Sequence, residues 1–95
     1  MVVGIMRLEL ELPGCFNLKQ KRRVLNRVRD RVHARFRAAV AETDRQEIWN
    51  AAELGVVVVS NETRHANEML SQILAYVEGC AELGVMDATM DFWHG

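Results

Sequence analysis

The residues best suited to chemistry lie in one segment of the chain, which reads "NLKQKRRVLNRVRDRVHARFR" over residues 17–37. It holds nine of the twelve lysines and arginines of the chain, and Asp30 is the one acidic residue among them. Guanidinium and ammonium groups bind phosphate oxygens through charge-assisted hydrogen bonds, so such a cluster is typical of a nucleic-acid-binding surface. The pattern predicts that six of these side chains contact phosphates: Lys19, Lys21, Arg22, Arg23, Arg27 and Arg31.

An ordinary solvated helix face is the other interpretation of this segment. Such faces usually carry an acid four residues from each base, and acids elsewhere on the fold can play the same part. Residues 19–37 carry nine positive charges and one negative, a balance of +8, and the remainder carries three positive and twelve negative, a balance of −9. Both interpretations stay open, but the asymmetry predicts a molecule with one basic and one acidic side.

Hydrophobic periodicity indicates the elements that position these cations. The alternation in "MRLELEL", residues 6–12, predicts a strand that ends at Pro13-Gly14. Asn17 is a suitable N-cap for a helix through the basic segment. The apolar residues of that helix recur on one stripe, which leaves the rest of its circumference to the cations: Leu18, Val24, Leu25, Val28, Val32 and Phe36.

The rest of the chain is expected to form two strands, a second helix and a last strand. Residues 38–43 predict a short strand, and the four valines of 56–59 predict a central strand. A second helix is expected from a cap at Ser60 or Asn61 to a stop at Gly79. Alternation in the last strand assigns four residues to the interior: Met86, Ala88, Met90 and Phe92.

The order β-α-β-β-α-β predicts a single α+β domain over residues 1–95, with the ferredoxin-like split βαβ fold. Its four-stranded antiparallel sheet would carry both helices on one face and leave the other face open. The strand residues expected on that open face are mostly acidic and include no aromatic ring, which argues against stacking of bases on the sheet. Trp49 and Trp93 are expected to cover the core locally.

The valine run also predicts a protein surface. Alternation places either Val57 and Val59 or Val56 and Val58 on the open face. Apolar residues in the middle of a charged face suggest a partner, such as a second copy of the sheet.

No set of residues for catalysis, metal binding or cofactor binding is apparent. His65 has Glu62 and Glu68 on either side, but no second histidine or cysteine cluster completes a metal site. Cys15 and Cys80 are expected to be reduced thiols, and nearby lysines would lower the pKa of Cys15 without supplying a base. Phosphate loops, dinucleotide fingerprints and nucleophile elbows are absent from the sequence. We therefore expect no enzyme and no cofactor.

Neither the N-terminal residues nor the apolar runs indicate export or membrane insertion. The start "MVVGIMRLEL" lacks a basic leader and a cleavage site, and runs such as "GVVVV" are far too short to span a bilayer. A cytoplasmic location is the expectation.

Several stretches of the chain resemble the YlxP-like family of small bacterial proteins of unknown function. These are "LKQKRRVL" after a Pro-Gly turn, then "ARF", "VAE", a tryptophan and "AELGVVVVSN" followed by a histidine. The resemblance implies a ferredoxin-like fold and a cytoplasmic protein. Family members are often encoded beside translation-initiation and ribosome-maturation factors, which implies a role near RNA or the ribosome. The family has no established catalytic residues.

The basic positions that match this family are Lys19, Lys21, Arg22 and Arg23. The chain departs from the family at "RFRAAV", where Arg-Phe-Asn-Val is usual, so the end of the helix need not serve the same purpose. The leading hypothesis is a non-enzymatic binding module associated with RNA or the ribosome. The alternative is a protein-interaction module that forms a homodimer through the open sheet face.

Overall fold

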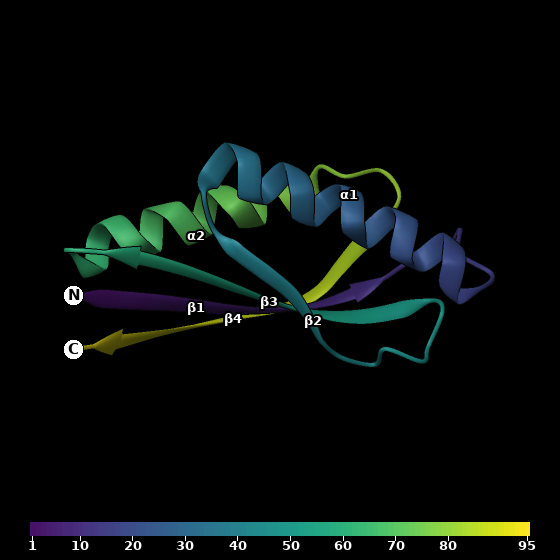
Figure 1. The fold of residues 1–95 in the computed structure, drawn as a ribbon, viewed down its shortest axis with the longest axis horizontal. Helices are drawn as coiled ribbons and strands as arrows, with labels where there is room; N and C mark the ends of the chain where they lie inside the picture. Colours follow the sequence, from purple (N-terminus) through teal and green to yellow (C-terminus); the bar gives the residue numbers. More distant parts are fainter.

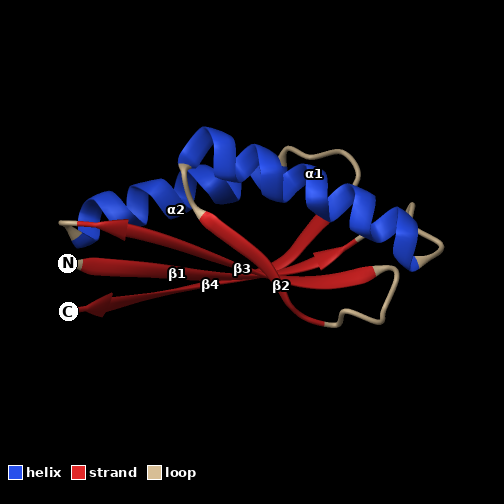
Figure 2. Cartoon of the chain, in the orientation of Figure 1, coloured by secondary structure: helices blue, strands red, loops and turns tan.

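The computed structural model describes residues 1–95 and contains four strands and two helices in the predicted order. Their bounds are β1 (Val2–Glu11), α1 (Leu18–Phe36), β2 (Ala39–Asp44), β3 (Ala51–Ser60), α2 (Thr63–Glu78) and β4 (Gly84–His94). The strands form one antiparallel sheet in the order β2-β3-β1-β4, so β1 and β3 are central as expected. Both helices lie on one face of this sheet (Figures 1 and 2). The ferredoxin-like α+β fold is confirmed.

Helix α1 begins where its sequence predicts, and four of the six predicted stripe residues are buried, together with Lys21. The Asn17 side chain caps it by accepting the backbone N–H of Gln20 at 2.9 Å. One stripe of the helix is buried against the sheet, and it consists of Lys21, Val24, Leu25, Val28 and Val32. The helix ends at Phe36, and its C-cap is Arg37, whose φ of 55° is left-handed and directs the chain into β2.

The start of α2 differs from the prediction, whereas its end agrees with it. The N-cap is Glu62, whose side chain makes no capping hydrogen bond, so the predicted cap at Ser60 or Asn61 is wrong. Ser60 instead accepts the backbone N–H of Glu62 through its hydroxyl oxygen, at 3.2 Å. Gly79 is the C-cap, as expected.

A bulge shifts the inward residues of β4 near its start. Leu10 of β1 pairs with Val85 and Glu9 pairs with Asp87, so Met86 has no partner in the register. The Met86 side chain is 65% exposed, and Val85 packs on the core in its place. The predicted inward position of Met86 is therefore wrong. Beyond the bulge the alternation holds, and Ala88, Met90 and Phe92 pack on the core.

A buried lysine ties α1 to the loop between β2 and β3. Lys21 is only 1% exposed, and its ammonium group donates to the backbone oxygens of Arg45 and Ile48, both at 2.6 Å. The same group lies 2.6 Å from Glu42 Oε2, a buried oxygen with no other polar partner. The contacts satisfy a charge that burial would otherwise penalise by several kcal/mol.

We predict that Lys21→Met destabilises the domain by about 3 kcal/mol, because the Glu42 carboxylate loses its counter-charge and the two carbonyls lose their donor. Urea denaturation followed by circular dichroism measures the change. The matched control, Lys19→Met, removes an exposed charge on the same turn and should change the free energy of unfolding by less than about 0.5 kcal/mol. Equal stabilities for the two variants would contradict the prediction.

Candidate functional site

Most cations of α1 have no acidic partner within the fold. Three of the nine in the basic segment form ion pairs: Lys21 with Glu42, Arg27 with Glu82, and Arg29 with its sequence neighbour Asp30. The other six are exposed and lie outside every ion pair of the domain: Lys19, Arg22, Arg23, Arg31, Arg35 and Arg37. Acids elsewhere on the fold therefore pair with only two of the nine cations, Lys21 and Arg27. Internal pairing thus does not account for the charge of the segment, and its exposed cations fit either a phosphate-binding surface or a solvated helix face.

Three arginines of α1 line two adjoining hollows. Arg23 and Arg27 border a hollow of about 330 Å³ beside the Pro13-Gly14 turn. Arg27 and Arg31 border the next, of about 460 Å³, between α1 and the end of α2. Four residues per step along a helix correspond to about 6 Å. Arg23, Arg27 and Arg31 therefore present their guanidinium groups at regular intervals along the shallow groove that the two hollows form.

Glu82, Cys15 and Cys80 also line these hollows. Glu82, in the loop after α2, pairs with Arg27 and competes there with any bound anion. Burial raises the pKa of Cys15, with a smaller contribution from Glu82, and outweighs the opposing effect of Lys21. Burial also raises the pKa of Cys80, whose thiol donates to the Tyr76 carbonyl at 3.5 Å. The predicted lowering of the Cys15 pKa is wrong, because the side chain is buried under the turn.

Five of the six predicted phosphate-binding residues lie on the exposed side of α1, and Lys21 does not. Lys19, Arg22, Arg23, Arg27 and Arg31 are solvent-exposed. The Lys21 ammonium is held inside the fold by the contacts described above, so its assignment to phosphate binding is corrected. A signal for this was available in the sequence. Position 21 precedes Val24, Leu25 and Val28 by three, four and seven residues, which places it in the apolar stripe.

The open sheet face has an apolar half and an ion-paired half. In the register, Val3 of β1 lies between Val59 and Trp93, and the next outward residue, Ile5, lies beside Val57. Val57 and Val59 are thus the exposed valines, whereas Val56 and Val58 are buried against the helices.

Charged residues occupy the other half, where two ion pairs join neighbouring elements. Arg7 Nε lies 2.7 Å from Glu53 Oε1, and Arg45 pairs with Glu9. These pairs hold four of the charges of the face. Asp87, beside Glu9, lies outside every ion pair, as does Asp91, which lies beside Ile5 at the edge of the apolar half.

Neither tryptophan covers the core as the sequence suggested. Trp49 is half exposed in the loop between β2 and β3, and Trp93 is similarly exposed on β4. Because Trp93 lies beside Val3 on the open face, that face does carry an aromatic ring. The expectation of a ringless face was wrong at this position, since the outward alternation of β4 extends past Asp91 to Trp93.

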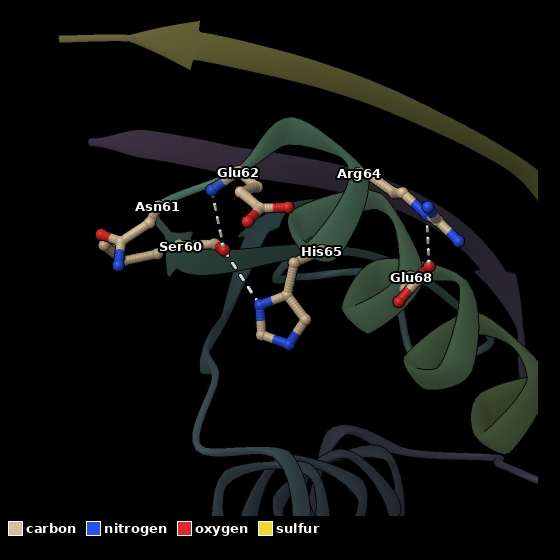
Figure 3. Close-up of a pocket in the computed structure, with 7 residues that line it drawn as sticks. Ser60, Asn61, Glu62, Arg64, His65 and Glu68 are labelled. Atoms are coloured by element: carbon tan, nitrogen blue, oxygen red, sulfur yellow. Dashed lines mark hydrogen bonds and ion pairs between the residues drawn. The ribbon is translucent and has the colours of Figure 1, made fainter.

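A third surface lies at the start of α2, around the His65, Glu62 and Glu68 that the sequence brings together. Ser60 Oγ and His65 Nδ1 are 2.9 Å apart, at the side of an open hollow of about 650 Å³ (Figure 3). Glu68 is turned toward Arg64, with 3.2 Å between its Oε1 and the arginine Nε (Figure 3). No three of the acidic, histidine or cysteine side chains converge to hold a metal ion. The Ser60–His65 hydrogen bond orients the imidazole and links the end of β3 to the first turn of α2.

The comparisons with known proteins identify a family without assigning an activity. Residues 3–90 match the family described as "Protein of unknown function (DUF503)". The chain is also similar to "Uncharacterized protein YlxP" of Bacillus subtilis (strain 168), with 27% identity over 82 residues, which cover 86% of this chain and 89% of that protein. Neither helix has the length and apolar character needed to cross a membrane. The chain belongs to the DUF503 family of proteins of unknown function, and its resemblance to YlxP-like proteins is confirmed.

Proposed function

We propose that this protein is a non-enzymatic RNA-binding module that contacts phosphate groups through the exposed face of α1. One observation carries the proposal: six exposed cations of the basic segment have no acidic partner in the domain. Like charges four residues apart on a helix repel one another, and here the fold supplies little to offset that repulsion. An RNA backbone offsets it from outside.

The geometry suits a backbone-directed contact better than readout of bases. Arg23, Arg27 and Arg31 follow the groove in steps of about 6 Å, over about 12 Å in all. Cations spaced along a rigid helix fix the register of a phosphate backbone but carry no sequence information. Recognition by this face would therefore depend on shape and charge. The family resemblance supports a cytoplasmic protein near the ribosome, where structured RNA is abundant.

We predict that replacing Arg23 and Arg31 together by glutamine weakens binding to a structured RNA hairpin and reduces its salt dependence. Each lost phosphate contact should lower the slope of log K against log salt by about 0.7–0.9, so the double variant should lose about 1.5. Electrophoretic shift or filter binding at several salt concentrations measures both quantities. Circular dichroism checks that the variant is folded.

The control variant is Arg64→Gln, which removes an exposed arginine from α2 rather than α1. It should retain the wild-type slope within error. Salt-insensitive binding by the wild type, or no binding at low salt, would contradict the proposal.

A second candidate function, a homodimer formed through the open sheet face, is favoured by the apolar half of that face. Val3, Ile5, Val57, Val59 and Trp93 are neighbours in the register, and they form a continuous surface. A two-fold axis through such a patch brings it against itself, which is the usual form of a dimer interface. Two ion pairs, Arg7 with Glu53 and Arg45 with Glu9, hold four of the charges outside this surface, and Asp91 lies at its edge beside Ile5.

We predict that the wild type is a dimer by light scattering at high protein concentration and that Val59→Asp is a monomer. The aspartate would bury an unpaired carboxylate at the centre of the interface. Thr89→Asp is the matched control, because Thr89 lies on the same face beside Arg7 in the ion-paired half. It should remain dimeric. A wild type that is monomeric at every concentration would rule out this candidate.

A further inference from the structure

Two exposed aromatic side chains lie at the end of the domain where α1 begins. Phe16, in the loop between β1 and α1, is 75% exposed, and Trp49, in the loop between β2 and β3, is 50% exposed. Ile48 beside Trp49 is also exposed. Burying an aromatic side chain is strongly favourable, yet neither of these rings is part of the core. Figure 1 shows both loops and the start of α1 at the end of the molecule opposite the chain termini.

Hydrogen bonds tie both loops to the first turns of α1. The backbone N–H of Phe16 donates to Gln20 Oε1 at 2.7 Å. The other loop is held by the buried Lys21, which bonds to the Arg45 and Ile48 carbonyls on the N-terminal side of Trp49. On its C-terminal side, the Asn50 carbonyl accepts the backbone N–H of Leu12 at 2.9 Å. Hydrogen bonds thus hold the backbone on both sides of Trp49, and its exposed ring projects from this fixed backbone.

The first two turns of α1, to which both loops are bonded, carry three cations without acidic partners. Lys19, Arg22 and Arg23 all lie within the first two turns of α1 and are exposed. Aromatic rings beside unpaired cations are the combination that proteins use to bind single-stranded nucleic acid. The rings stack on bases and the cations hold the phosphates. Duplex RNA keeps its bases stacked on each other, so its bases are not available to such rings.

We propose that Phe16 and Trp49 stack on unpaired bases of single-stranded RNA whose phosphates lie along Lys19, Arg22 and Arg23. This inference rests on the proposed function and deepens it, because it names unpaired RNA segments as the preferred ligand. Lys21 is then a positioning residue: it touches no RNA and holds the loop that presents Trp49. An apolar protein segment is the competing occupant of the two rings, and it would not require the adjoining cations.

The two tryptophans of the chain make the proposal directly testable by fluorescence. Trp93→Phe leaves Trp49 as the sole tryptophan, and Trp49→Phe leaves Trp93, which lies on the open sheet face. Each is titrated with a short single strand of alternating A and C, which cannot pair with itself, and with a blunt RNA duplex. We expect the single strand to quench Trp49 emission and to leave Trp93 emission unchanged, with a much smaller effect of the duplex on Trp49.

Affinity measurements on alanine variants give a second readout. Phe16→Ala and Trp49→Ala should each weaken binding of the single strand about tenfold, within the range seen for loss of one stacked base. Their salt slopes should stay at the wild-type value, because no phosphate contact is removed. Trp93→Ala is the matched control and should bind as the wild type does. All three side chains are exposed, so the variants are expected to fold.

The outcomes separate this inference from the proposed function. If single strand and duplex bind equally and Trp49 emission does not change, stacking is overturned while phosphate contact by α1 stands. If neither RNA binds at low salt, both are overturned. Unchanged single-strand affinity in a Phe16→Ala, Trp49→Ala double variant also overturns stacking. An apolar protein segment is then the ligand that the two exposed rings would fit.

Discussion

The packing of one stripe of α1 against the sheet determines which side of the helix exposes its positive charges to solvent. Val24, Leu25, Val28 and Val32 are buried on the sheet, so the helix cannot rotate without exposing them. Every cation outside this stripe must then face solvent. The open face of the sheet, where other strand carboxylates lie, is on the far side of the molecule, so those acids cannot approach α1. The fold therefore retains an unneutralised basic surface, and this repulsion is what a phosphate partner would relieve.

Lys21 is the exception that connects this surface to the rest of the domain. It occupies a position in the buried stripe, and its long side chain carries the ammonium group to Glu42 and to two carbonyls of the β2–β3 loop. The same residue thus joins α1 to β2 and to the β2–β3 loop. Through that loop, the rigidity of α1 extends to the exposed Trp49. The open sheet face is organised differently, by ion pairs in one half and mostly apolar neighbours in the other.

Much of the fold was predictable because its signals are local. Alternation in β1, the helical spacing in α1, the Asn17 cap and the Gly79 stop each depend on residues within a few positions of one another. The candidate site was predictable in part. The exposed arginines were identified, whereas the burial of Lys21, the exposure of both tryptophans and the bulge at Met86 were not. The position of Lys21 in the buried stripe follows from its helical spacing, but its polar partners come from β2 and the loop after it. The bulge at Met86 depends on the register with β1.

The sequence by itself determined the order of the elements, the fold class and the concentration of positive charge on one amphipathic helix. These follow from short-range periodicity and from composition, which need no knowledge of the partners of a residue. Only the tertiary structure decided which cations remain unpaired, which valines face outward and which aromatic rings reach solvent. Those properties depend on contacts such as that between Lys21 and Ile48, 27 residues apart. Contacts of that range exist only once the sheet and helices have packed, because packing alone brings distant side chains within hydrogen-bonding distance.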